Sequence, residues 1–243
     1  MKLSEISASS FDPSIWKEKG YQLPQFDVKA VREKTAAAPT WLHFGAGNIF
    51  RAFPAAVLQK ALDAGQYDRG VIVAEGFDYE IIDKAYAPYE NLSLLVSLKS
   101  TGDIEKKVIG SVTECLKADY QFENDWARLA DIFRKPSLQM ISFTITEKGY
   151  GVAPHDLERG LTPVLAMGKI AVLLYERFQA GKLPLLLLAE TQTCQHALNA
   201  AGPLVAARVL KAAGEAAVCK DVCNNRFNSC RSSSNFNSNN RKL

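Results

Sequence analysis

The sequence predicts an α/β fold with a mainly parallel β-sheet. Two observations lead to this fold class. Short apolar runs of strand length recur at residues 40–44, 70–76, 137–146 and 183–188. Segments with apolar residues at helical spacing lie between most of them. A chain that alternates strands with helices in this way builds a parallel sheet covered by helices.

The composition indicates a globular chain and excludes several function classes. The 243 residues suit one large domain, and 47% of them are hydrophobic and 23% charged. The net charge is only +3 and no run of five Lys or Arg residues occurs, so we expect no nucleic-acid partner. The longest apolar run, residues 183–189, is too short to cross a membrane. Residues 1–13 lack a signal-peptide core, and an odd count of five cysteines does not suggest a disulfide framework, so we expect a cytoplasmic location.

Residues 1–38 are expected to form an N-terminal arm and not a domain. They are polar and mixed in character. Pro13 stands just inside a predicted short helix, where proline is favoured. Residues 28–35 are predicted to form a second helix ahead of the first strand of the sheet.

Residues 39–188 are expected to form a dinucleotide-binding domain, whose central feature is a glycine turn. Strand 40–44 runs into Gly45-Ala46-Gly47 and then into the start of a helix. Two residues without a Cβ let the backbone turn sharply and approach a ligand closely. The helix start directs free N–H groups and a positive dipole end at the turn, which suits a pyrophosphate. The predicted cofactor contacts here are Gly45, Ala46, Gly47, Asn48, Ile49, Phe50 and Arg51.

The alternative is an ordinary strand-to-helix turn that binds nothing. Phe50 stands where the G-x-G-x-x-G fingerprint has its third glycine. The helix after the turn is predicted over residues 51–64, with Phe53, Val57, Leu58 and Leu62 among the residues of its apolar face. The residues of the next predicted strand help to decide between a dinucleotide-binding turn and an ordinary one.

Glu75 ends the second predicted strand, 28 residues after Gly47. An acid near this place in a βαβ unit holds a ribose 2′-OH. Its charge would repel a 2′-phosphate, so NAD is favoured over NADP. The alternatives are Asp78 as the ribose ligand, or a Glu75 that is a solvated charge at a strand end.

The remaining elements complete the predicted sheet. Residues 91–98 and 106–116 are predicted to pair as an inserted β-hairpin about the turn at residues 100–103. Residues 122–133 are predicted to be an amphipathic helix, and residues 161–179 a further helix before strand 183–188. Strand 137–146 runs into residues 146–150, which places a third candidate segment at the same sheet edge as the glycine turn and Glu75.

The character of the chain changes after residue 188. Residues 189–218 are alanine-rich and are expected to be an aberrant, helix-prone segment. Residues 219–243 are rich in Asn and Ser, and we expect a disordered tail there, because such a composition buries too little apolar surface to order itself. Cys219, Cys223 and Cys230 have no established zinc spacing, so no metal site is expected.

Two segments resemble the mannitol dehydrogenase family of polyol and hexonate dehydrogenases, which includes fructuronate and tagaturonate reductases. Residues 43–52 (HFGAGNIFRA) are similar to the glycine turn of that family, and residues 142–150 (SFTITEKGY) to its T-x-T-E-K-G-Y segment. The resemblance implies a Rossmann-like, doubly wound N-terminal domain that binds NAD. It implies hydride transfer between the nicotinamide and a sugar alcohol or hexonate. It also places Thr146 at the cofactor, and Glu147 and Lys148 near the reacting groups.

The sequence departs from the family after residue 188. It contains neither the S-x-D-N segment nor the K-x4-N-x2-H segment that carries the catalytic lysine of the family. A helical C-terminal substrate domain is therefore expected to be missing. The alternatives left open are a truncated or frameshifted, inactive dinucleotide-binding fragment, and a sugar-binding or regulatory protein. A domain face that normally packs on the helical domain is expected to favour self-association. We place no general base at His43, His155 or His196.

Overall fold

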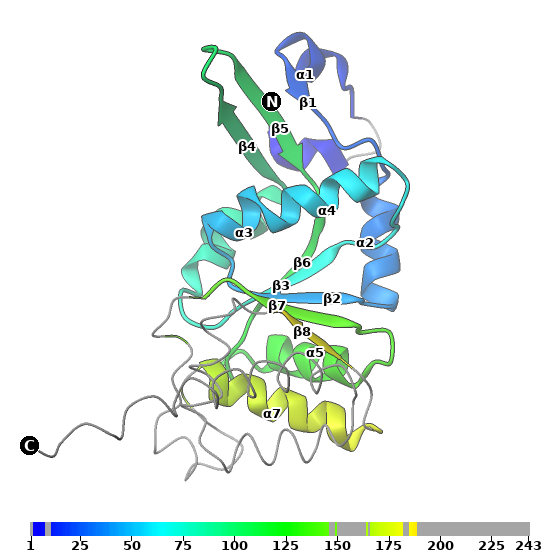
Figure 1. Cartoon of the computed structure of the whole chain (residues 1–243), viewed down its shortest axis with the longest axis vertical. Helices are drawn as coiled ribbons and strands as arrows, with labels where there is room; N and C mark the ends of the chain where they lie inside the picture. The colour runs from blue at the N-terminus through cyan, green and yellow to red at the C-terminus, as the bar shows by residue number, and fades with distance from the viewer. Residues whose placement is uncertain are drawn as a thin grey trace, which may run out of the picture.

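The computed structural model describes residues 2–7, 11–145, 149, 164, 166–181 and 185–188. Figure 1 shows a central sheet that lies between two layers of helices, with a smaller sheet standing on one of these layers. The segments at residues 189–218 and 219–243 lie outside the described residues. Within the described residues, no helix is both long enough and apolar enough to cross a lipid bilayer.

The central sheet has five strands in the order β6-β3-β2-β7-β8. Every pair in it is parallel, which confirms the predicted fold class. The chain starts at β2, moves outward through β3 to β6, and then returns to the other side of β2 for β7 and β8. The order therefore reverses between β2 and β7, where a doubly wound sheet forms its ligand crevice. The strands are β2 (Trp41–Phe44), β3 (Val71–Glu75), β6 (Val112–Lys117), β7 (Met140–Phe143) and β8 (Leu186–Leu188).

Helices cover both faces of this sheet. On one face lie α2 (Val28–Ala37), α3 (Asn48–Ala52) and α4 (Pro54–Asp63), and on the other α5 (Glu123–Arg134) and α7 (Ala166–Gln179) (Figure 1). Successive residues of β3 enter different cores. Val71 and Val73 pack with α3 and α4, whereas Ile72 and Ala74 pack with α5 and α7. This burial on both faces explains why the strand is a continuous apolar run with no polar alternation.

The small sheet has the order β1-β5-β4, with β1 (Tyr21–Gln22), β4 (Ser93–Leu98) and β5 (Ile104–Ile109). Strands β4 and β5 form the predicted antiparallel hairpin, with Ser93 opposite Ile109 and Leu98 opposite Ile104. The residues expected as an N-terminal arm supply η1 (Leu3–Ser7), α1 (Ser14–Glu18), β1 and α2. Trp16 of this segment packs with Leu92 and Val108 near the small sheet.

The predicted second hairpin arm, residues 106–116, is in fact two strands of two sheets. Strand β5 ends at Ile109 and β6 begins at Val112. Between them the Gly110 amide donates to Gln59 Oε1 at 2.9 Å, and Ser111 Oγ donates to the Ala55 carbonyl at 2.7 Å. These bonds to α4 replace strand pairing and turn the chain from one sheet to the other. Both strands are β-rich, so periodicity alone does not mark this boundary.

The helix after the glycine turn also differs from its prediction. It begins at Asn48 as α3, breaks at Phe53, and resumes as α4 with Pro54 at its first position. Proline has no N–H to donate to the preceding turn, which explains the break. Phe53 and Val57 were predicted in the apolar face but are 68% and 52% exposed, whereas Leu58 and Leu62 are buried.

Candidate functional site

The glycine turn lies at the carboxyl end of β2, and its two glycines differ in conformation. Gly45 has φ +111°, and a Cβ there would lie 2.6 Å from the Thr144 carbonyl oxygen. Only glycine fits that position. Gly47 has φ −71° and caps α3, and a Cβ there would meet no atom within 4 Å. Open space above Gly47 is what a ligand needs to approach the backbone closely.

Neighbouring strands hold the backbone of Gly45 and Ala46. The Gly45 amide donates to the Ala74 carbonyl at 2.9 Å, and the Ala46 amide donates to Glu75 Oε2 at 2.8 Å. The Tyr86 hydroxyl, from η2 (Ile82–Tyr86), donates to the Ala46 carbonyl at 2.8 Å. Burial raises the pKa of Tyr86, so this hydroxyl keeps its proton. The turn is therefore fixed by β3 and η2 before any ligand binds.

The amides of the next residues remain available. Within the described residues, the amides of Gly47, Asn48 and Ile49 donate to no acceptor. The first amides of a helix have no partner within that helix and attract anions. The Arg51 guanidinium adds positive charge here, lying 5.4 Å from the centre of the Tyr86 ring and donating to the Asn48 side chain. This group of donors fits a pyrophosphate.

Glu75 lies at the end of β3, beside the turn. Its carboxylate accepts from three backbone amides: Ala46 at 2.8 Å, Phe77 at 3.0 Å and Asp78 at 3.3 Å. Oε1 accepts two of these bonds and Oε2 accepts one, so with two acceptor sites on each oxygen Oε2 can still accept from one ribose hydroxyl. The alternative acid, Asp78, uses its own amide to hold Glu75. Glu75 is thus hydrogen-bonded to the backbone of the turn and is not a fully solvated charge at the end of a strand.

Phe50 and His43 form the floor of the turn. Phe50 is fully buried and stacks on the His43 ring, with centroids 4.1 Å apart. At the place of the third glycine, the chain thus packs the helix against β2 through an aromatic ring. Burial lowers the pKa of His43 to about 3, so its imidazole is neutral at physiological pH. Phe50 is 0% exposed, so it supports the turn from below and offers no surface to a ligand.

Sequence reasoning missed a buried charge cluster at the same sheet edge. Lys169 of α7 is 4% exposed and donates to Asp119, which follows β6, and to the Tyr79 hydroxyl at 3.1 Å. Tyr79 also donates to Asp119 Oδ2 at 2.9 Å. Burial opposes ionisation of Asp119, but hydrogen bonds from Lys169, the Gln121 amide and Tyr79 outweigh it and lower its pKa. The cluster ties α7 to the loop that follows Glu75.

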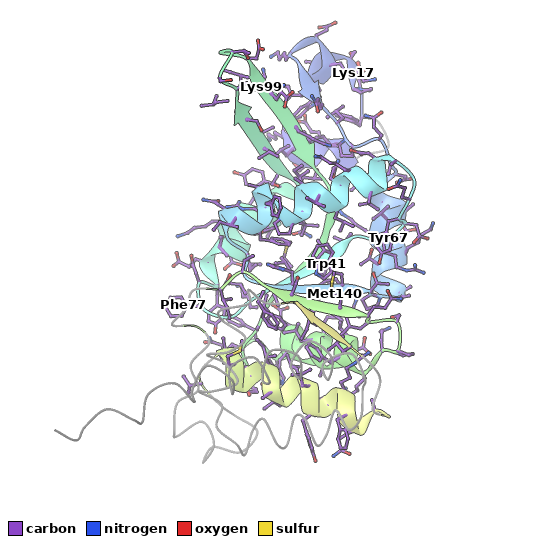
Figure 2. All side chains as sticks on the ribbon, in the orientation of Figure 1. Lys17, Trp41, Tyr67, Phe77, Lys99 and Met140 are labelled. Atoms are coloured by element: carbon purple, nitrogen blue, oxygen red, sulfur yellow. The ribbon has the colours of Figure 1, made fainter. Side chains whose placement is uncertain are left out.

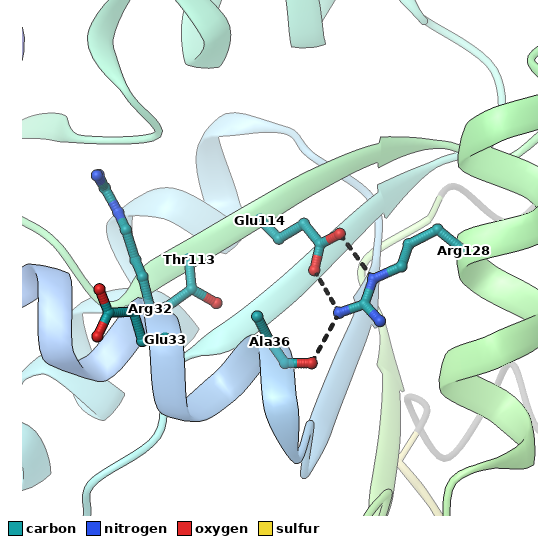
Figure 3. A pocket seen from close by; sticks show the side chains of 6 residues that line it. All are labelled: Arg32, Glu33, Ala36, Thr113, Glu114 and Arg128. Atoms are coloured by element: carbon teal, nitrogen blue, oxygen red, sulfur yellow. Dashed lines mark hydrogen bonds and ion pairs between the residues drawn. The ribbon is translucent and has the colours of Figure 1, made fainter.

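A surface hollow of about 440 Å³ lies away from this edge, between α2, β6 and α5 (Figure 3). Arg128 spans it, donating to both oxygens of Glu114 at 2.9 and 3.0 Å and to the Ala36 carbonyl at 3.2 Å. The walls are thus joined to each other, and Thr113 and Glu114 belong to the amino-terminal half of β6. We assign the hollow no ligand.

Several predicted site residues lie in the part of the chain that the structure does not describe. Thr146, Glu147 and Lys148 lie outside the described residues, as do His155, His196 and the cysteines after residue 188. Thr144 and Ile145 are described and follow the end of β7 next to the glycine turn. Among the described residues, no group of three or more His, Cys, Asp or Glu side chains is arranged to hold a metal ion.

Comparison with known proteins gives the following relatives. The chain is 49% identical over 189 residues to the D-mannonate oxidoreductase of Thermotoga maritima, which covers 73% of this chain and 35% of that protein. It is 29% identical over 178 residues to the D-arabinitol 4-dehydrogenase of Ralstonia nicotianae, covering 68% of this chain and 37% of that protein. The chain thus spans about a third of the length of the curated relatives it matches. No family model matches it.

A solved structure shares the fold. The mannitol 2-dehydrogenase of Pseudomonas fluorescens, in a ternary complex with NAD and D-mannitol, superposes with a TM-score of 0.68 at 24% identity. The match covers 86% of this chain and 44% of that one. It supports a partial, N-terminal Rossmann-like domain.

Proposed function

Because this chain belongs to the mannitol dehydrogenase family, we propose that it is the dinucleotide-binding part of an NAD-dependent oxidoreductase acting on a hexonate or sugar alcohol. The hexonate class is favoured, since the relative with 49% identity is named a D-mannonate oxidoreductase. Bound NAD would supply the hydride acceptor. A cytoplasmic location belongs to the same proposal.

One observation carries the cofactor proposal: the amides of Gly47, Asn48 and Ile49 and the carboxylate of Glu75 lie at the same edge of the sheet. The amides suit the pyrophosphate and the carboxylate suits a ribose diol. The strand order reverses between β2 and β7, next to this turn, which supports a ligand site there. Phe77, 91% exposed, extends from the loop beyond Glu75 (Figure 2).

The carboxylate of Glu75 also supports NAD over NADP. A phosphate on the 2′ oxygen would bring negative charge next to a carboxylate that three amides hold in place. Like charges at short range repel, and no Lys or Arg side chain donates to Glu75 among the described residues.

Binding of NADH and NADPH, followed by nicotinamide fluorescence, tests the proposal. We expect NADH to bind more tightly than NADPH. Glu75→Gln should weaken NADH binding about 10–150-fold, since a hydrogen bond to a charged group contributes about 1.5–3 kcal/mol. It should also reduce the difference in affinity between NADH and NADPH, because the repelling charge is gone. Asp78→Asn is the matched control and should leave NADH affinity within about twofold. A larger effect of Asp78→Asn would assign the ribose to Asp78, and a wild-type chain that binds neither nucleotide would refute the cofactor proposal.

A second candidate function is nucleotide binding without turnover, because the described residues that support the proposal belong to the dinucleotide edge and none of them has a catalytic role. Assays for NADH formation with mannonate, altronate and mannitol separate the two functions. Turnover of any of them supports the enzyme, and NADH binding with no turnover supports the binding module or a sugar-binding regulatory protein.

A further inference from the structure

A continuous series of hydrogen bonds runs beneath the glycine turn from β2 to β7 and back. Trp41 Nε1 donates to Ser142 Oγ at 2.7 Å, and this oxygen lies 2.6 Å from His43 Nδ1. His43 Nε2 lies 2.8 Å from Thr144 Oγ1. Thr144 Oγ1 in turn lies 3.4 Å from the Gly45 carbonyl oxygen. The series starts at an indole and ends beside the turn.

The chemistry of the groups gives this series one direction. An indole N–H can only donate, so Ser142 Oγ accepts from Trp41. The Ser142 proton then goes to His43 Nδ1, because no other acceptor for it lies among the described residues. A neutral imidazole that accepts at Nδ1 carries its proton at Nε2. His43 therefore donates to Thr144 Oγ1.

The Thr144 hydroxyl oxygen therefore accepts one hydrogen bond, from His43, and the hydroxyl can still donate one. The nearest described acceptor is the Gly45 carbonyl at 3.4 Å, well beyond the usual O–H···O distance of about 2.7–2.8 Å. The Thr144 side chain is half-buried and lies just past the end of β7. It thus lies at the strand ends where the order of the sheet reverses between β2 and β7, on the side of β2 opposite Glu75.

We propose that the Thr144 hydroxyl is a coenzyme-binding donor to an oxygen of the nicotinamide mononucleotide half, and that His43 is the residue that positions it. This inference rests on the proposed function. A dinucleotide across the crevice has its adenosine half over β3, at Glu75, so the other half passes over β7. Because the Thr144 oxygen accepts from His43, the hydroxyl can donate its proton to a ligand oxygen. It is therefore expected to act as a donor to the ligand and not as an acceptor.

The affinity of NADH measures the contact. Thr144→Val removes the hydroxyl at nearly constant volume and should weaken NADH about 3–10-fold, the value of one hydrogen bond of about 0.5–1.5 kcal/mol. Thr144→Ser should bind like the wild type. The affinity for 5′-AMP, which has only the adenosine half, should stay unchanged in both variants. Thr101→Val, in the exposed hairpin turn, is the matched control and should change neither affinity.

The role of His43 has its own measurements. Long-range ¹H–¹⁵N correlation spectra of the wild-type chain should show the Nε2–H tautomer of His43, identified by the signal lost in His43→Gln. His43→Leu should weaken NADH as much as Thr144→Val does, and His43→Gln should restore the affinity, because its amide can donate to Thr144. If His43→Gln does not fold, replacing the other two histidines, His155 and His196, assigns the same signal, so the tautomer measurement does not depend on that variant.

The outcomes separate this inference from the proposed function. If wild-type protein binds NADH and Thr144→Val binds it equally well, the Thr144 contact is refuted while the cofactor proposal stands. An Nδ1–H tautomer would refute the positioning role of His43. If wild-type protein binds no NADH, the proposed function fails, and this inference fails with it.

Discussion

The glycine turn after β2 and the tip of the β4–β5 hairpin make the same demand on the backbone in opposite surroundings. Gly45 and Gly102 both have positive φ, +111° and +88°. A Cβ on Gly45 would meet Thr144 backbone at 2.6 Å, whereas one on Gly102 would meet nothing within 4 Å. The turn is enclosed by β3, β7 and η2, and the hairpin tip is open to solvent. The same local conformation thus belongs to an enclosed turn in one place and to an open chain reversal in the other.

The largest difference is expected between the stability contributions of two ion pairs, one buried at the sheet edge of the glycine turn and one exposed in the hairpin. Asp119→Asn leaves the Lys169 ammonium buried without its counter-charge, so we expect a loss of about 3–5 kcal/mol in the free energy of unfolding. The hairpin pair Lys99–Glu105, with both side chains nearly half exposed, is the matched case, and Glu105→Gln should cost less than about 1 kcal/mol. Urea unfolding followed by circular dichroism measures both. Equal losses would contradict the contrast.

Substituting the two glycines tests the contrast directly. Gly45→Ala combines a strained φ, worth about 1–2 kcal/mol, with a steric clash worth about 1–3 kcal/mol. Gly102→Ala carries only the first cost. Gly47→Ala, with negative φ and open surroundings, should change stability by less than about 0.5 kcal/mol but reduce NADH binding. If Gly45→Ala proved as mild as Gly102→Ala, the turn would be less enclosed than described.

The pH dependence of stability should report the enclosure of His43. Burial lowers its pKa to about 3 in the folded chain, from 6.5. Between those values the unfolded chain binds a proton that the folded chain does not, so stability is full above pH 6.5 and falls as the pH drops toward 3. The loss reaches about 1.4 kcal/mol per pH unit. The difference between wild type and His43→Gln isolates this slope, and a flat difference would mean that His43 is solvated.

The smallest change in stability is expected for a substitution on the exposed face of β4. Leu94, Val96 and Leu98 are 41%, 49% and 78% exposed, and β4 pairs with β5 alone in its sheet. A second copy that paired along this edge would meet no charge in residues 93–98 to oppose the pairing. Leu98→Lys should leave stability within about 0.5 kcal/mol and lower the dimer fraction in sedimentation velocity. Unchanged sedimentation would place the contact elsewhere.

Much of the architecture could be predicted because it follows from local patterns. The apolar runs that became β2, β3 and β7 are continuous since both faces of each strand are buried. Gly45 could be identified because a sharp strand-to-helix turn needs a residue without Cβ. The place of Glu75 next to the turn could be predicted because this residue ends one of these runs. Each of these inferences uses residues that are neighbours in the chain.

Other features depend on partners far apart in the sequence, and no local pattern signals them. The boundary between β5 and β6 depends on Gln59 and Ala55 of α4. The Lys169–Asp119–Tyr79 cluster joins three elements, and Thr144 acquires its direction from Trp41 and His43 across a strand pairing. Periodicity and turn chemistry are properties of a segment, so the residues alone specify the strands, the turn and their order. Burial, hydrogen-bond direction and the sharing of one sheet edge are properties of the packed chain, and they arise only when the distant segments meet.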